Sequence, residues 1–300
     1  MKVRVLGSAA GGGVPQWNCG CENCREARRP GGTVHPRTQE SVAVSPDGDS
    51  WFLLNVSPEV RAQLESFPSL WPRDRRHSPV SGLLLTNGDL DHCLGLLSLR
   101  ESYPLVIYAT ESVRNGFTSG NVLYRTLERF ADQVTWRTLA IGHEQQLGDG
   151  ALTVTAVATP GKLPLHLEEV RAPSPDDNVG LVIRDGRTNR SLAYFSGVAG
   201  PSPALVRAVT DADLVFFDGT FWSSDELIAL GLGTRRAEEM AHWPVGGPDG
   251  SLPFVSRLRG RRILIHINNT NPILRAGSAE QHAVQAAGIE VAADGLEVTL

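Results

Sequence analysis

The chain has 300 residues, of which 41% are hydrophobic and 20% charged, and its formal net charge is -5. This composition is typical of a globular protein of one or two domains. The negative charge and the shortness of the arginine clusters at 73–76 and 257–262 argue against a nucleic-acid-binding surface. No run approaches the roughly 18 apolar residues of a membrane span, and residues 1–13 lack the pattern of a secretion signal. We therefore expect a cytoplasmic protein with reduced cysteines and no membrane partner.

Predicted strands and helices mix along the chain without strict alternation. The strands are predicted at 3–6, 41–45, 51–56, 82–85, 105–109, 152–158, 179–183, 191–195, 214–217 and 263–267. The helices are predicted from Pro58 and at 92–102, 123–131, 204–209, 224–230 and 278–286. Two mixed sheets packed face to face with helices outside account for this order better than a doubly wound parallel sheet. The loop 162–178 is interpreted as a flap over a site.

A cluster of potential metal ligands follows the apolar run 82–85. Asp89, Asp91 and His92 stand close together where a strand would turn into a helix. An extended strand end points Asp89 and Asp91 to the same side, while the turn presents His92. This mixture of carboxylate and imidazole suits a divalent cation. The alternative is a solvated turn in which an aspartate caps the next helix, but His266 far downstream favours the metal site.

Three of the four cysteines crowd into one short segment. The thiolates of Cys19, Cys21 and Cys24 would repel each other unless a cation joins them. Zinc takes four tetrahedral ligands, so the cluster predicts a structural zinc site with one ligand from elsewhere in the chain. Free or redox-active thiols are the alternative. Cys93 stands apart in an apolar segment and is predicted to lie in the core.

The glycine-rich segment 7–13 follows the first predicted strand. It lacks the phosphate-binding lysine and fits neither the Rossmann nor the Walker spacing, which argues against nucleotide binding. The glycines instead predict a sharp turn or a backbone that passes close to a site.

Two later strands also end in polar residues. Asp218 ends an apolar run, where a carboxylate is either paired, metal-bound or exposed in a turn. His266 lies within the apolar run 263–267 and is followed by three asparagines, which are costly to bury without partners. This pattern indicates a site. His242 ends a predicted helix and is either a proton shuttle or a cap of the helix C-terminus.

Taken in chain order, Asp91, His92, Asp218 and His266 resemble the metal-ligand series of the metallo-β-lactamase superfamily. The resemblance implies an αββα sandwich, with two mixed β-sheets flanked by helices and the metal at one rim.

The chain departs from the usual motif of that superfamily. In the HxHxDH motif, both leading histidines are replaced, by Asn87 and Asp89. Lys162 stands near the place of a further histidine, and residues 196–198 contain no bridging aspartate. These departures imply too few ligands for a conventional two-metal hydrolase.

The same departures, together with residues 7–13, 15–19, 86–92, 218–220 and 266–272, resemble the PqqB family of pyrroloquinoline quinone (PQQ) biosynthesis. The resemblance spans nearly the whole chain. It implies a single metallo-β-lactamase-like domain over residues 1–300 with an N-terminal cysteine-rich zinc loop. It also implies a small substrate, a cross-linked Glu–Tyr precursor whose tyrosine ring is oxygenated before the final cyclisation.

The resemblance also suggests candidates for the fourth ligand of the cysteine site. In phosphodiesterase relatives, three clustered cysteines share zinc with a histidine three residues after the active-site histidine. That position is Asn269 in this sequence, and His35 is a second candidate.

Residues and resemblance together predict a mononuclear metal site. Two histidines and one carboxylate with open coordination positions are the ligand set of non-haem iron(II) enzymes that use dioxygen. We therefore expect an iron-dependent tyrosine-ring hydroxylase, an oxidoreductase, in which Asp91, His92 and His266 bind Fe(II) or another divalent metal.

The remaining polar residues are assigned supporting roles in this hypothesis. Asp218 and Asp89 are expected either as weaker ligands or as hydrogen-bonding partners of the ligands, and His242 is expected to move the phenol proton. The first alternative is a mononuclear hydrolase, in which the metal lowers the pKa of an attacking water.

The second alternative is a carrier that binds the precursor or the finished quinone. Trp17, Trp222 and Trp243 would then stack on the planar ligand, although tryptophans more often lie in a core. All three hypotheses expect a small-molecule partner and leave a homodimer open.

Overall fold

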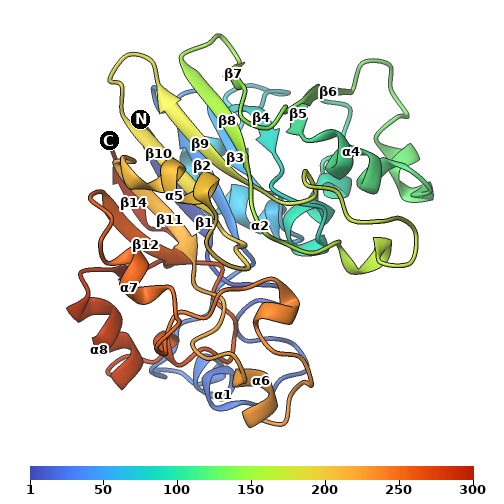
Figure 1. Cartoon of the computed structure of the whole chain (residues 1–300). Helices are drawn as coiled ribbons and strands as arrows, with labels where there is room; N and C mark the ends of the chain where they lie inside the picture. Colours follow the sequence, from blue (N-terminus) through green and yellow to red (C-terminus); the bar gives the residue numbers. More distant parts are fainter.

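The computed structural model describes residues 1–300, and two mixed β-sheets pack face to face at its centre (Figure 1). The first sheet has the strand order β14-β1-β2-β3-β4-β5-β6, and the second has the order β13-β12-β11-β10-β9-β8-β7. Helices flank the pair of sheets, which confirms the predicted αββα sandwich. None of the helices combines the length and apolar character needed to cross a lipid bilayer.

The strands of the first sheet are β1 (Lys2–Gly7), β2 (Ser41–Ser45), β3 (Trp51–Leu54), β4 (Val80–Leu84), β5 (Leu105–Ala109), β6 (Val134–Thr138) and β14 (Glu297–Thr299). Those of the second sheet are β7 (Glu144–Leu147), β8 (Leu152–Ala158), β9 (Val179–Asp185), β10 (Ser191–Phe195), β11 (Leu214–Asp218), β12 (Arg261–Ile265) and β13 (Glu290–Val291). The α-helices are α1 (Glu22–Arg28), α2 (Val60–Glu65), α3 (Leu90–Cys93), α4 (Glu111–Thr118), α5 (Pro203–Thr210), α6 (Glu226–Ala229), α7 (Leu252–Val255) and α8 (Ala279–Ala286).

Short 3-10 helices complete the structure. They are η1 (Pro68–Leu70), η2 (Leu94–Ser98), η3 (Val122–Thr126), η4 (Leu165–Leu167), η5 (Glu238–Met240) and η6 (Pro272–Leu274).

Alternate side chains of the central strands face two different cores. In β11, Leu214 and Phe216 lie between the sheets, whereas Val215 and Phe217 lie under the outer helices. Every residue of β11 is buried, so the strand carries a continuous apolar run instead of an alternating one. Burial of each large side chain stabilises the fold by roughly 1.5–3 kcal/mol. The sandwich therefore gives a rigid frame to the loops at its rim.

The topology explains why polar residues from distant segments meet at one rim. Strands β3 to β6 run parallel in the first sheet, and strands β10 to β13 run parallel in the second. Carboxyl ends of parallel strands share one edge of a sheet, and ligand sites form there. An isolated parallel bridge between Ala9 and Ile267 joins the two sheets at this rim.

Several predicted elements differ from the structure. The helix predicted at 92–102 is α3 followed by η2, and the one predicted at 123–131 is only η3. A Cβ on Gly95 would lie 2.1 Å from the carbonyl oxygen of Ser57, so this segment is shaped by close packing onto neighbouring backbone. The sequence does not indicate the edge strands β6 and β7, because most of their residues are polar and exposed or partly exposed.

Candidate metal centre and its pocket

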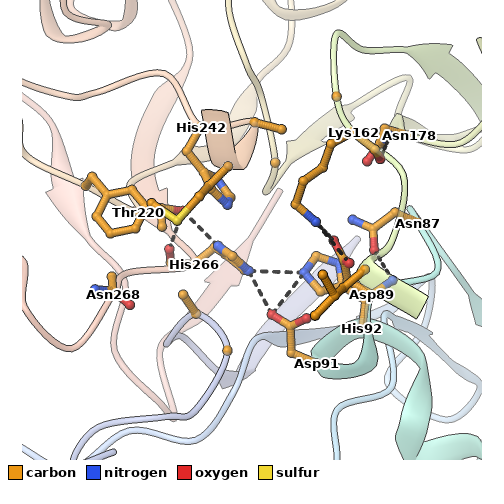
Figure 2. Close-up of a pocket in the computed structure, with 18 of the residues that line it drawn as sticks. Asn87, Asp89, Asp91, His92, Lys162, Asn178, Thr220, His242, His266 and Asn268 are labelled. Atoms are coloured by element: carbon orange, nitrogen blue, oxygen red, sulfur yellow. Dashed lines mark hydrogen bonds and ion pairs between the residues drawn. The ribbon is translucent and has the colours of Figure 1, made fainter. Parts of the chain in front are cut away.

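Three side chains at the rim converge to form a candidate metal centre (Figure 2). His266 Nε2 lies 3.2 Å from Asp91 Oδ2 and 3.1 Å from His92 Nε2, and the third side, between His92 Nε2 and Asp91 Oδ2, measures 3.6 Å. Metal bonds of about 2.1 Å to nitrogen and oxygen place neighbouring ligands roughly 3 Å apart, so the triangle fits one divalent cation. The sequence-predicted residues Asp91, His92 and His266 are thus brought together.

Local backbone geometry explains how these residues reach the rim. Asp89 is the extended N-cap of α3, so Asp91 and His92 occupy its first turn. His266 follows the last residue of β12 and has a φ of 59°, a left-handed conformation that bulky residues adopt only under constraint. At Gly11, an added Cβ would lie 3.2 Å from Asp91 Oδ2, as expected for a glycine that lets backbone pass close to a site.

The three groups differ in their affinity for protons. Burial lowers the pKa of His92 to about 4. Burial also opposes the charge on His266, but its hydrogen bond to Asp91 and the negative charge of Asp91 raise the pKa of His266 to about 9. The same imidazoles outweigh the effect of burial on Asp91 and hold the pKa of its carboxyl well below the usual range. Without a cation, the cluster therefore keeps a proton on His266, which a divalent metal would displace.

A chain of hydrogen-bonding groups supports His92 from behind. His92 Nδ1 lies 3.0 Å from Thr86 Oγ1 and 2.9 Å from Asn55 Nδ2. Thr86 Oγ1 donates to Asn55 Oδ1 at 3.0 Å, and Asn55 Nδ2 donates to Glu40 Oε2 at 3.0 Å. When His92 binds metal through Nε2, its proton is on Nδ1 and Thr86 is the acceptor. Glu40 is fully buried, which raises its pKa to about 8.

A second threonine supports His266. Its Nδ1 lies 2.8 Å from Thr220 Oγ1, which donates to Asp218 Oδ1 at 2.6 Å. Thr220 follows the Asp-Gly pair at the end of β11, just as Thr86 follows the end of β4. Both threonines lie in segments that carry the family resemblance, 86–92 and 218–220, but the sequence assigns them no role. Each stands two residues after the end of a strand at the site.

Asp218 is completely buried and accepts four hydrogen bonds. Its donors are the backbone N–H groups of Val198 and Thr220, the Thr220 hydroxyl and His242 Nδ1. Because both oxygens are fully used, this arrangement fits the hydrogen-bonding role predicted for Asp218 better than a ligand role. The Asp218 Oδ2 contact with His242 Nδ1, at 2.8 Å, leaves His242 Nε2 as the free nitrogen of a residue that lines the pocket.

Asp89 forms an ion pair instead of joining the triangle. Lys162 Nζ lies 3.2 Å from both carboxylate oxygens of Asp89, and Figure 2 shows the lysine reaching toward Asp89. The backbone N–H of Asp89 donates to Asn87 Oδ1 at 2.9 Å. Asp89 is therefore placed as a neighbour of the ligands.

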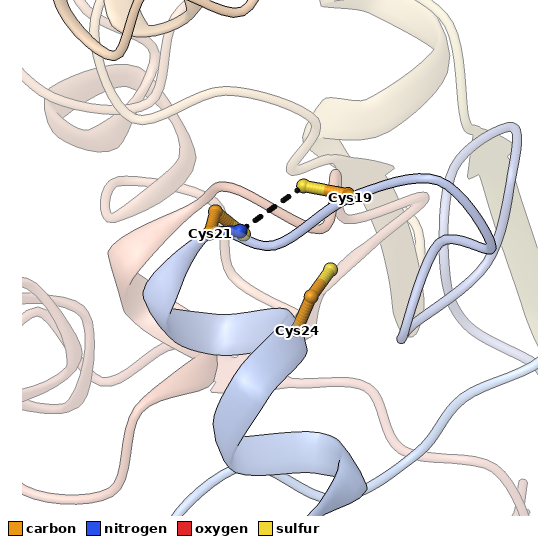
Figure 3. A group of neighbouring side chains, drawn as sticks. All are labelled: Cys19, Cys21 and Cys24. Carbon is orange, nitrogen blue, oxygen red and sulfur yellow. Dashed lines mark hydrogen bonds between the residues drawn. The ribbon is translucent and has the colours of Figure 1, made fainter.

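The three clustered cysteines form a second candidate metal site (Figure 3). The sulfur atoms of Cys19, Cys21 and Cys24 all lie within 4.8 Å of one another. Asn269 Nδ2 lies 3.2, 3.6 and 3.2 Å from them, and rotation of this amide by 180° would present Oδ1 instead. Burial raises the pKa of Cys21 to about 11, so its thiolate form requires a nearby cation. The other candidate, His35, is exposed and does not join the group.

A cavity of about 320 Å³ opens beside the carboxylate–histidine triangle. Its wall includes His242, Lys162 and Arg235, and the predicted flap 162–178 also contributes Leu165 and Glu168. None of Trp17, Trp222 and Trp243 lines this cavity, and Trp17 is 86% exposed. The stacking that motivated the carrier hypothesis therefore has no basis in this pocket.

An αββα sandwich with carboxylate and imidazole groups at one rim defines a protein of the metallo-β-lactamase superfamily. A family model described as beta-lactamase superfamily domain matches residues 50–267. Over their full lengths, the chain is 41% identical to coenzyme PQQ synthesis protein B of Azotobacter vinelandii and 44% identical to that of Ruegeria pomeroyi. The chain belongs to the coenzyme PQQ synthesis protein B family.

A solved structure of a family member agrees with this assignment, and a more distant one shows the same fold. The crystal structure of Zn(2+)-bound PqqB from Methylobacterium extorquens has a TM-score of 0.93, with 42% identity and complete coverage of both chains. A diphosphatase of the PhnP family shares the fold with a TM-score of 0.67 and 20% identity, covering 100% of this chain and 97% of its own. The family therefore includes a metal-binding member of nearly the same structure.

Proposed function

We propose that this protein acts in PQQ synthesis as an iron(II)-dependent oxygenase that hydroxylates the tyrosine ring of a cross-linked Glu–Tyr precursor. The single observation that carries the proposal is the set of two histidines and one aspartate beside an open cavity. This is the ligand set of non-haem iron enzymes, and a metal held by these three residues would keep coordination positions free. The names of the full-length relatives support the pathway.

The chain's own residues supply binding and proton transfer in this proposal. Asp91, His92 and His266 would hold the iron, and iron(II) held in this way supplies one-electron chemistry with dioxygen. His242 Nε2 would take the phenol proton, because Asp218 holds the other ring nitrogen. One oxygen atom of dioxygen enters the ring in place of hydrogen and the other leaves as water. The balance requires two electrons and two protons, with the electrons from an external reductant such as ascorbate.

The test is a labelled-oxygen experiment. Metal-free protein is loaded anaerobically with iron(II), mixed with the precursor and ascorbate, and exposed to ¹⁸O₂. We expect a product that carries labelled oxygen on the tyrosine ring, detected by mass spectrometry. Zinc-loaded protein is the control, because zinc has no redox chemistry. A correctly loaded protein that binds the precursor without incorporating label would contradict the oxygenase proposal.

The hydrolase hypothesis is retained as a second candidate because of one contact. The Asp218–His242 pair positions a general base, and such a base can also accept a proton from a water molecule whose pKa a bound metal would lower. Under anaerobic conditions, this candidate predicts that the zinc-loaded protein cleaves an ester or amide form of the precursor. The oxygenase proposal predicts no turnover under those conditions.

A further inference from the structure

Lys162 and Arg235 are the two cationic side chains, apart from the histidines, in the wall of the active-site cavity. Lys162 is paired with Asp89, whereas Arg235 forms no ion pair within the chain. The acidic residues of the wall are Asp89, Asp91 and Glu168. A cation at the triangle would neutralise Asp91, and Lys162 neutralises Asp89. Glu168 is exposed in the segment 162–178 and, like Arg235, forms no ion pair. Arg235 therefore provides a positive charge that the wall leaves available to a ligand.

The Arg235 backbone is tied to the proposed base. Arg235 lies on the segment between α6 and η5, and the next buried residue is Ala237. The N–H of Ala237 donates to the carbonyl of Ser224 at 2.8 Å, and its carbonyl accepts from the N–H of His242 at 3.0 Å. These bonds fix the arginine segment relative to His242. The adjacent Arg236 is also exposed but does not line the cavity.

The position of Lys162 is fixed by a different segment. The side chain of Asn178 donates to the carbonyl of Lys162 at 2.7 Å. A Cβ on Gly161 would lie 2.3 Å from that side chain, so the backbone is closely packed here. The side chains of Lys162 and Asp89 are 29% and 27% exposed, so the lysine ammonium is accessible from the cavity.

We propose that Arg235, assisted by Lys162, binds carboxylate groups of the substrate and so selects a polycarboxylate ligand. This inference rests on the proposed function, because a Glu–Tyr precursor and PQQ both carry several carboxylates around a planar or phenolic ring. A guanidinium makes paired hydrogen bonds with a carboxylate, which fixes orientation as well as charge. Anchoring the carboxylates in this way directs the ring toward His242 and the metal centre.

The experiment compares PQQ with its trimethyl ester, which keeps the ring system and replaces the three negative carboxylates with neutral methyl esters. Their affinities for zinc-loaded protein are measured by calorimetry without iron or dioxygen. We expect Arg235→Met to weaken the binding of PQQ by about tenfold or more and to leave the binding of the ester unchanged. Lys162→Met should have a smaller effect of the same kind, because Lys162 already pairs with Asp89. Arg236→Met is the matched control and should bind both probes as the parent protein does.

The outcomes separate this inference from the oxygenase proposal. Unchanged PQQ affinity in Arg235→Met, or an equal loss for PQQ and its ester, would overturn the carboxylate assignment. If Arg235→Met loses affinity for PQQ but not for the ester, while the parent protein fails the labelled-oxygen test, the role of Arg235 is supported and only the proposed reaction is contradicted. Circular dichroism of each variant checks that the fold is retained.

Discussion

The cysteine cluster and the carboxylate–histidine cluster are linked by one short segment, because His266 contacts the second and Asn269 the first. Their surroundings differ. The thiols come from one loop and α1 and face an amide, whereas Asp91, His92 and His266 come from both sheets and face a cavity. A closed thiolate site is suited to structural zinc, and an open site of mixed ligands is suited to chemistry. The comparison shows that two candidate metal sites of different kind, one enclosed by thiols and one open to a cavity, lie close together at the rim.

Within the open site, the two histidines have similar hydrogen-bonding partners, but the charge behind those partners differs. Each imidazole has its Nδ1 beside a threonine hydroxyl, Thr86 for His92 and Thr220 for His266. The Thr86 hydroxyl in turn donates to the neutral side-chain amide of Asn55, whereas the Thr220 hydroxyl donates to the Asp218 carboxylate. Negative neighbours keep His266 charged in the absence of metal, while His92 stays neutral.

The largest expected effect concerns the cysteine cluster. We predict that Cys21→Ser removes zinc and lowers the free energy of unfolding by several kcal/mol, because structural zinc contributes directly to folding. Metal analysis and chemical denaturation measure both effects. Cys93→Ala, which removes the buried thiol outside the cluster, should retain its zinc. If Cys21→Ser instead loses the active-site metal and keeps the zinc, the two sites have been assigned wrongly.

Substitution of Thr86 and Thr220 tests whether their hydroxyl groups orient the imidazoles of His92 and His266. Thr220→Val and Thr86→Val keep the side-chain shape but remove the hydroxyl that contacts Nδ1. We expect the affinity for the active-site metal to fall by about 10- to 100-fold in each variant, while the fold survives. Competition with a metal-binding dye measures the change. Unaltered affinity in both variants would show that the hydroxyls do not orient the ligands.

The pH dependence of stability tests whether Glu40 is a buried carboxyl with a raised pKa. Burial raises its pKa to about 8 in the metal-free protein, compared with about 4.3 in an unfolded chain. The folded protein therefore binds this proton more tightly, and stability is lost as the pH rises from about 4.3 through 8. We predict that Glu40→Gln removes this loss, so that the stability of the variant relative to the parent increases between pH 5 and pH 8. Urea denaturation of metal-free proteins at both values measures it, and a pH-independent difference would argue against a buried ionisable Glu40.

Much of the site could be predicted because its polar residues stand at or soon after the ends of apolar strands. Asp91, His92, Asp218 and His266 follow or end β4, β11 and β12, and a charged residue at such a position stands out in the sequence. The sequence does not show whether Asp89 is a metal ligand or part of an ion pair. Its partner Lys162 is 73 residues away, in a segment without a recognisable secondary-structure pattern.

The supporting residues were harder to predict from sequence. Glu40, Asn55 and Thr220 are of types that are mostly exposed in proteins, and only the folded structure shows that they are buried beside the candidate ligands. The same holds for Arg235, whose exposed segment resembles ordinary surface. The fold was clearer because fully buried strands such as β11 have long apolar runs, whereas polar edge strands such as β6 do not.

The most direct test of the account is a metal analysis of two purified variants beside the parent protein. His266→Ala removes one of three ligands, so we predict that it folds, binds the active-site metal far more weakly and has only background activity. His242→Ala should keep the metal and lose most of its turnover, because its nearest partners are Asp218 and Thr220. If His242→Ala loses the metal and His266→Ala retains it, ligand and base have been exchanged and the proposed mechanism is wrong.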